Sequence, residues 1–349
     1  MKNVWKPGLV LLVCLSAGGQ DAATNSYTQT NLVSDVPGMA LSTDPSLVNP
    51  WGLSRPSQPT AGEAHWWAAD QATGLTTLYD ANGSVVPLVV TIPPASGTGA
   101  GSPTGTVFYN KNFVFVTLDG TISQWFAGTT PSQPGPGCAR CHVTTATIKM
   151  NNAGAGAVYT GITVANNGGV PTYYAANSTG GVEAYTTSYN PVALPAGAFV
   201  DSNIPTSYKP FGIQSVGSKI YVTFSRPFPS PGGYVDVFDT TGTLLLSLQH
   251  GNWFNEPWGI AKAPSNFGAF SNTVLVGNVG NGAIAAFNPN TGKFLGFLKN
   301  SSGAVIVNSG LWALSFGTGN ADTGPTNVLY FNAGIQGYQH GLFGAIAAN

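Results

Sequence analysis

The phrase Pro210-Phe211-Gly212-Ile213 returns almost unchanged as Pro257-Trp258-Gly259-Ile260 further along the chain. It also occurs as Pro50-Trp51-Gly52-Leu53. Weaker copies are Pro103-Thr104-Gly105-Thr106, Tyr159-Thr160-Gly161-Ile162 and Leu311-Trp312-Ala313-Leu314. The third positions of the six copies are 53, 56, 51, 47 and 54 residues apart. A period near 50 residues is typical of a repeat architecture.

A second phrase follows in each unit, in which a glycine precedes alternating apolar residues and a final aromatic residue. Its clearest copies are residues 120–125, 181–185, 233–238 and 282–287. Between the two phrases lie apolar segments such as 113–117 and 219–223. Short alternating segments separated by Gly, Asn and Pro indicate strands. No stretch has a sustained helical period.

Six units of four short strands predict an all-β fold, a six-bladed β-propeller formed by one domain over residues 24–349. The repeated glycine would lie where the innermost strands crowd the axis. The last unit ends near Ile346 after three strands, so we expect the segment from Tyr27 to Val33 to supply the fourth and close the ring. A pair of β-sandwiches and a solenoid are the alternatives.

Charge is scarce in this chain. Only 7% of its 349 residues are charged and the net charge is −1, against about 25% charged residues in ordinary soluble proteins. The chain therefore lacks the excess of positive charge that would attract nucleic acid or an anionic membrane. A surface of Asn, Thr, Ser and Gly suits secreted proteins and proteins that pack against copies of themselves.

The N-terminus has the pattern of an export signal. Lys2 and Lys6 precede an apolar run over residues 8–17, which is too short to span a bilayer. We expect residues 1–23 to be a signal peptide, with cleavage between Gly18 and Ala23, and the mature protein to be periplasmic, cell-surface or extracellular. No other segment predicts a membrane span.

The mature chain then has two cysteines, both in Cys138-Ala139-Arg140-Cys141-His142. C-x-x-C-H is the attachment signature of c-type haem. Cys138 and Cys141 would form thioethers with one haem c, and His142 would be an axial iron ligand. Arg140 would pair with a haem propionate, or be a solvated loop charge.

Other readings of the cysteine pair remain open. An oxidising compartment favours a small disulfide. A redox-active thiol pair needs a helix N-terminus, which the flanking residues do not predict. A zinc site needs about four ligands, and three cluster here.

The runs from Asn31 to Asp35 and from Thr43 to Leu53 resemble the opening of a family of exported bacterial proteins of unknown function. Glu256-Pro-Trp-Gly259, the run ending at Phe270 and the run 340–345 fit the same pattern. The resemblance implies a six-bladed propeller and export, and it implies no activity. In that pattern little separates the third and fourth strands of blade two. Here residues 128–143 are inserted, and they contain the haem signature.

The sixth iron ligand is less certain, and strand order helps to rank the candidates. His65 opens the second strand of blade one, on the same face as the insertion, so we favour it. His250 and His340 belong to the opposite face, although His250 of another subunit could serve. Met39, Met150 and an open site are the remaining choices. Trp125 and Phe126 could wall the haem or simply pack in the core.

We therefore predict an exported monohaem c-type cytochrome that transfers electrons and is not an enzyme. Its redox partners are unknown, and a homo-oligomer or filament could bring neighbouring haems together. The alternative is a binding or structural module in which the cysteines form a disulfide. The sequence shows no group of catalytic residues that would support a haem-dependent oxidoreductase. Asp70, Asp119, Asn177 and Asn278 recur at one position and are interpreted as turn caps, or less simply as a calcium site.

Overall fold

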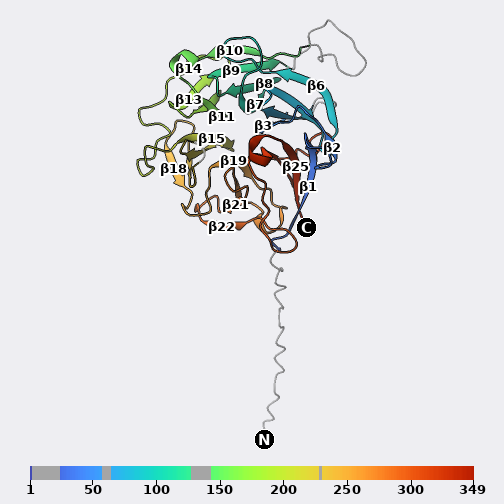
Figure 1. The fold of residues 1–349 in the computed structure, drawn as a ribbon. Helices are drawn as coiled ribbons and strands as arrows, with labels where there is room; N and C mark the ends of the chain where they lie inside the picture. Colours follow the sequence, from blue (N-terminus) through green and yellow to red (C-terminus); the bar gives the residue numbers. More distant parts are fainter. Residues whose placement is uncertain (2–23, 57–63, 127–142, 228–229) are drawn as a thin grey trace.

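The chain forms a ring of six antiparallel sheets around a central axis (Figure 1). The computed structural model describes residues 1, 24–56, 64–126, 143–227 and 230–349. The prediction of an all-β, six-bladed propeller is confirmed.

In blades one to five, the strands follow chain order from the axis to the rim in each sheet. Blade one consists of β3 (Pro50–Ser54), β4 (Trp66–Asp70), β5 (Leu75–Tyr79) and β6 (Val85–Thr91). Blade two consists of β7 (Pro103–Tyr109), β8 (Asn112–Thr117), β9 (Thr121–Phe126) and β10 (Thr147–Asn151). Blade three consists of β11 (Tyr159–Asn167), β12 (Val170–Asn177), β13 (Gly181–Thr186) and β14 (Pro191–Val192).

Blade four consists of β15 (Lys209–Val216), β16 (Lys219–Ser225), β17 (Tyr234–Phe238) and β18 (Leu244–Ser247). Blade five consists of β19 (Pro257–Lys262), β20 (Val274–Asn278), β21 (Ile284–Phe287) and β22 (Phe294–Phe297). Helical structure in the described residues is limited to the 3-10 turns Ala153–Ala155 and Gly268–Phe270 and the short α1 (Ile335–Tyr338).

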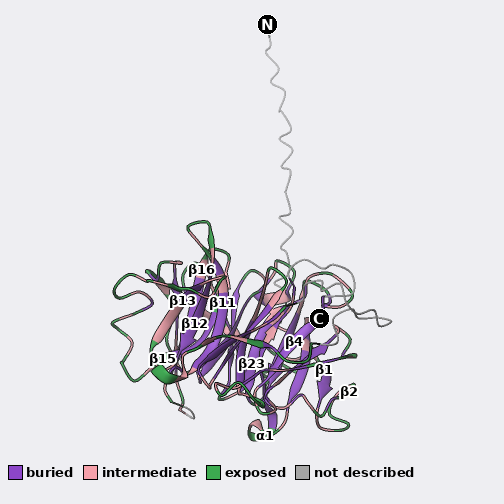
Figure 2. Ribbon diagram, turned by 90° about the horizontal axis from the view of Figure 1, so that it is seen from above, coloured by how far each residue is buried: buried purple, intermediate pink, exposed green. Residues whose placement is uncertain are grey.

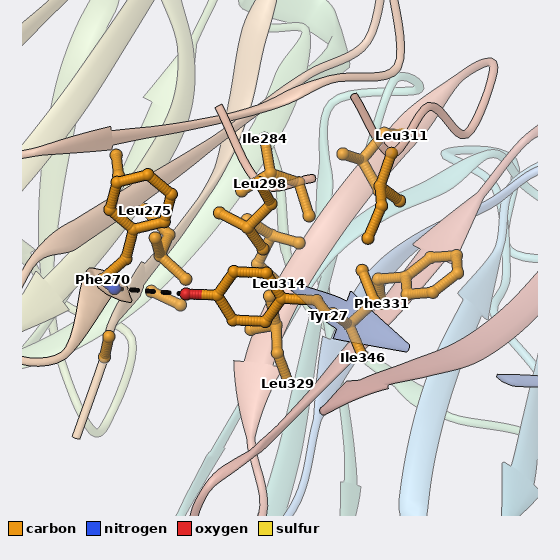
Figure 3. Close-up of a cluster of buried hydrophobic side chains, with 14 of the residues drawn as sticks. Tyr27, Phe270, Leu275, Ile284, Leu298, Leu311, Leu314, Leu329, Phe331 and Ile346 are labelled. Carbon is orange, nitrogen blue, oxygen red and sulfur yellow. Dashed lines mark hydrogen bonds between the residues drawn. The ribbon is translucent and has the colours of Figure 1, made fainter. Parts of the chain in front are cut away.

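Blade six joins the two ends of the chain, as predicted. It consists of β23 (Leu311–Phe316), β24 (Val328–Ala333), β25 (Leu342–Ala348) and β1 (Tyr27–Ser34), with the short β2 (Ser42–Thr43) parallel to β1. The antiparallel register runs from Tyr27 opposite Ala348 to Ser34 opposite Leu342. The Tyr27 side chain is buried in a cluster formed by blades five and six, where its hydroxyl accepts a 3.1 Å hydrogen bond from the Phe270 amide (Figure 3).

The repeated glycines let the innermost strands approach one another. A Cβ atom at Gly52 would lie 2.5 Å from the Thr104 carbonyl oxygen, and one at Gly212 would lie 2.2 Å from that of Trp258. Real side chains do not tolerate contacts this short, so only glycine fits. The predicted crowding at the axis is confirmed.

Most of the core lies in the seams between blades, where strands bury both faces (Figure 2). A separate group of side chains fills the axis itself. We call it the axial aromatic cluster, and its members are Trp51, Phe211, Trp258 and Trp312. These are the aromatic residues at the second position of the repeated phrase. Each stands near the start of an innermost strand, so the cluster closes one end of the axis.

The ring has two faces that differ in which loops they carry. We call upper the face with the loops between the first and second and between the third and fourth strands of each blade. The lower face carries the loops between the second and third strands and the connections between blades. Because strands alternate in direction, this assignment follows from the order of the strands.

Candidate functional site

The strands that flank the predicted haem segment meet it at the upper face of blade two. Cys138, Arg140, Cys141 and His142 lie outside the described residues, within 127–142. The chain leaves β9 at Phe126 and enters β10 at Thr147, so the segment connects the third and fourth strands.

His65 is the predicted sixth ligand, and it immediately precedes β4 at the upper end of blade one. This places it one blade away from the haem segment and on the same face. Its Nδ1 atom is buried and has no hydrogen-bond partner among the described residues. Two positions later, the Trp67 indole packs on Phe113 and Trp125 of blade two, with ring centroids 4.0 and 4.8 Å away.

The two aromatic residues at the end of β9 have different environments. Trp125 is 3% exposed and belongs to the core between blades one and two. It is therefore a core residue and does not form an exposed wall. Its Nε1 donates a 2.8 Å hydrogen bond to the Val143 carbonyl, which holds the end of the insertion against the blade. Phe126 is 52% exposed.

A shallow hollow lies at the base of the insertion, between β9 and β10. Its volume is about 160 Å³. The lining residues are Gln124, Trp125, Phe126, Val143, Thr145, Thr147 and Lys149. Trp125, Phe126 and Val143 give this hollow an apolar surface, and Lys149 adds one positive charge. The hollow is too small to enclose a porphyrin ring.

The structure places the other two histidines on the lower face. His250 follows β18 and stacks on Tyr234, with ring centroids 4.3 Å apart. His340 lies between β24 and β25, and its Nδ1 is 2.6 Å from the Asp35 carboxylate. Asp35 also accepts a hydrogen bond from the Gly341 amide. His340 therefore fastens the end of β1 to the loop that precedes β25.

The two methionine candidates have ordinary surroundings. Met39 is 38% exposed in the arm between β1 and β2. Met150 lies on β10 and packs against the core between blades two and three. Neither is brought to His65 by the fold.

Three of the recurring Asp and Asn residues hold the backbone that leads into an innermost strand, and Asn177 also accepts a hydrogen bond from the Thr179 amide in its own turn, as a turn cap would. Side-chain oxygens of Asp119, Asn177 and Asn278 accept hydrogen bonds from the amides of Ser102, Val158 and Asn255, respectively. Each of these amides directly precedes an innermost strand or lies two residues before it. In the part of the chain that the structure describes, no three His, Cys, Asp or Glu residues are grouped to hold a metal ion.

Asp70, the fourth of these residues, is less well satisfied. One carboxylate oxygen accepts a 2.8 Å hydrogen bond from the Thr77 hydroxyl. The other is buried without a partner in the described residues. Burial raises the pKa of Asp70 well above its usual value, and the nearby Asp44 adds to the shift.

The sequence reasoning missed a second feature of the upper face, the open mouth of the central axis. Its volume is about 470 Å³. Arg55 and Lys262 line it, each three residues after a repeated glycine. That spacing was visible in the sequence, but only the closed ring shows that the two positions face one mouth.

The comparisons with known proteins give relatives without a characterised function. No protein-family model matches the chain. Uncharacterized protein R648 of Acanthamoeba polyphaga mimivirus is 28% identical over 94% of this chain and 82% of its own length. Uncharacterized protein L690 of the same virus is 26% identical over 94% of this chain and 87% of its own length. These relatives are viral, so they lend no support to a bacterial family.

Among solved structures, the WD40 propeller domain of Doa1 covers 93% of this chain at 9% identity, with a TM-score of 0.46. The Dos1 propeller covers 88% at 8% identity, with a TM-score of 0.47. We base the fold on the strand order of this chain rather than on these similarities. The described residues contain no helix with the length and apolar character needed to cross a membrane.

Proposed function

We propose that this protein is a non-enzymatic binding and carrier module, in which a rigid propeller presents its functional residues on the upper face. The observation that supports this is where the unusual features lie. The connection 127–142, His65 and the open axial mouth all belong to the upper face. The opposite end of the axis is closed by the axial aromatic cluster.

We further propose that the module carries one covalent haem c and exchanges electrons with partner proteins. Cys138 and Cys141 would hold the porphyrin through thioethers, and His142 would bind the iron. The haem supplies a one-electron redox centre. Arg140 would pair with a propionate group. Export to the periplasm, cell surface or medium is part of this proposal, because c-type haem signatures and the N-terminal pattern point the same way.

The residue that best fits a haem near this segment is His65. A buried imidazole nitrogen without a hydrogen-bond partner is unfavourable. Coordination of this nitrogen to iron would give it a partner and remove that cost. No described residue other than His65 combines an imidazole with the upper face of blades one and two.

A second candidate function keeps the propeller and omits the haem. Cys138 and Cys141 would then close a small disulfide within the connection between β9 and β10. The module would bind a partner or build a surface layer through its low-charge exterior. The uncharacterized relatives share nearly the whole chain, which agrees with a role that resides in the propeller itself.

One experiment separates the two candidates. The full chain is expressed with the c-type haem maturation system, denatured, and stained for haem peroxidase activity, with Cys138→Ser/Cys141→Ser as the control. The cytochrome proposal expects stain in the wild type and none in the double variant. An unstained wild type whose two thiols react with alkylating reagent only after reduction would establish the disulfide instead.

The ligand assignment has its own test. His65→Ala is compared with His250→Ala, which removes an imidazole from the lower face. We expect the first to convert a low-spin visible spectrum to high-spin and the second to leave it unchanged. The reverse result, with a dependence on protein concentration, would assign the ligand to another subunit. Sedimentation of the haem-loaded protein as a monomer at all concentrations would reject a filament.

A further inference from the structure

Two of the six innermost strands are followed or ended by a cation at the upper face. Arg55 follows β3 of blade one, and Lys262 ends β19 of blade five. Both lie three residues after the repeated glycine, so they reach the same level along the axis. Both side chains line the 470 Å³ mouth.

The mouth is positively charged and its charge is not balanced. Its lining includes Arg55 and Lys262 and, among the described residues, no carboxylate. Neither cation forms a salt bridge within the described part of the chain, where the ion pair joins His340 to Asp35. Glu63 belongs to residues 57–63, outside the described residues. In a chain with only 12 basic residues, two at one opening are a notable concentration.

Existing contacts fix the guanidinium of Arg55 without using all its donors. Its Nε and Nη2 atoms donate hydrogen bonds of 2.8 and 2.5 Å to the Phe316 carbonyl. Its Cζ atom lies 5.3 Å from the centre of the Trp66 ring. A guanidinium has five N–H donors, so three have no partner among the described residues. Burial lowers the pKa of Arg55 to about 10, and the group is still charged at pH 7.

A backbone carbonyl also holds the ammonium group of Lys262. Its Nζ atom donates to the carbonyl of Asn272, which leaves two of the three ammonium donors. Burial lowers the pKa of Lys262. Around the two cations, Ser54, Thr106, Gln214 and Ser215 give the wall polar groups.

The mouth has a floor, so it is a funnel rather than a channel. Below it the free volume falls to about 30 Å³. The axial aromatic cluster lies beneath, four residues before Arg55 on β3 and four before Lys262 on β19. At about 3.3 Å per residue this is roughly 13 Å deep. A ligand can enter and leave only through the upper face.

We propose that this funnel binds a small molecule with at least one carboxylate or phosphate group, held between Arg55 and Lys262. Cations with unused donors in a partly desolvated, blind funnel are suited to an oxyanion. This inference rests on the proposed binding role, but it uses none of the residues 127–142. The two proposals can therefore fail separately.

The test is calorimetric titration of the full chain with citrate and, separately, with inorganic phosphate at constant ionic strength. We expect saturable binding of one anion per chain, and the stronger probe identifies the class. Lys262→Gln should weaken binding about tenfold, equivalent to about 1.4 kcal/mol. Arg55→Gln should weaken it at least as much, with circular dichroism used to check folding.

Lys219→Gln is the matched control, because Lys219 begins β16 on the upper face but does not line the funnel. It should bind like the wild type. Absence of saturable binding with both probes would overturn the proposal. So would equal affinities of the wild type and Lys262→Gln, or an equal loss in Lys219→Gln.

Discussion

The indole rings of Trp51 and Trp312 stack face to face, with centroids 3.7 Å apart and planes 18° from parallel. Trp51 lies in the innermost strand of blade one and Trp312 in that of blade six. The Nε1 atom of Trp312 also donates a 3.0 Å hydrogen bond to the Asn49 side chain. The junction between the first and last blades is thus closed at the axis, while β1 closes it at the rim.

Trp312→Ala should lower the free energy of unfolding by about 3–5 kcal/mol, because it empties the centre of the axial aromatic cluster. Urea unfolding followed by circular dichroism measures this loss. Trp253→Ala is the matched control, since Trp253 lies on the outer side of the ring and stacks on Phe294. A loss in Trp312→Ala no larger than in the control would show that the stack does not hold the junction.

Tyr27→Phe should cost about 1–3 kcal/mol, although it removes one oxygen atom. The Tyr27 hydroxyl donates to the Phe267 carbonyl and accepts from the Phe270 amide, both at 3.1 Å. These bonds tie the closing strand to blade five. Tyr221→Phe is the control, because the Tyr221 hydroxyl forms no hydrogen bond with the described residues. This variant should unfold at nearly the wild-type urea concentration. Identical midpoints for both variants would contradict the role given to Tyr27.

Asp70→Asn should stabilise the protein at pH 7 by about 1–2 kcal/mol. Since burial raises the pKa of Asp70 in the folded state, ionisation favours unfolding as the pH rises above the ordinary value. Asparagine keeps an acceptor for Thr77 and carries no charge, and it already occupies the matching positions 177 and 278. The gain should shrink as the pH falls toward 4. Melting temperatures that are equal at pH 7 would refute this.

Asp236 predicts a second pH effect. Burial raises its pKa to about 7, against the lowering effect of a hydrogen bond to Ser247. The stability that it contributes is present at pH below about 4 and is lost as the pH rises toward 7. Asp236→Asn should remove this part of the slope in melting temperature between pH 4 and 8.

Asp239→Asn is the control of opposite sign. Burial acts to raise the pKa of Asp239, but hydrogen bonds from Thr241 and Thr243 outweigh it and lower that pKa. Asp239 therefore contributes stability that is lost as the pH falls. If Asp236→Asn leaves the slope above pH 4 unchanged, Asp236 is ionised in the folded protein.

The ring architecture could be predicted because the repeated phrase recurs at a regular spacing along the sequence. Repeated glycines mark the innermost strands, and the missing fourth strand of the last unit points to the segment at Tyr27. Strand order also placed His65 on the face of the 127–142 connection. Its role as a ligand stays a prediction, as do the roles of Cys138, Cys141 and His142.

Contacts across the ring could not be predicted in the same way. The aromatic residues of the repeated phrase meet at the axis only because six blades close around it. Arg55 and Lys262 are 207 positions apart in the sequence and share one funnel for the same reason. For Trp125 the sequence left a haem wall and core packing open, and contact with Trp67 of the neighbouring blade decides for the core.

The pairing of β1 with β25 also means that the ring cannot close until both strands have been synthesised. Thr28 and Asn349, which share a hydrogen bond, are 321 positions apart. Of the described strands, β1 is synthesised first and β25 last, so β1 must wait for its partner until all the others have been made. A product that stops anywhere before the final strand leaves blade six without its edge, exposed to proteases. Only a chain that contains both β1 and β25 can close the ring in this way, so the order of the strands makes closure the last step of assembly.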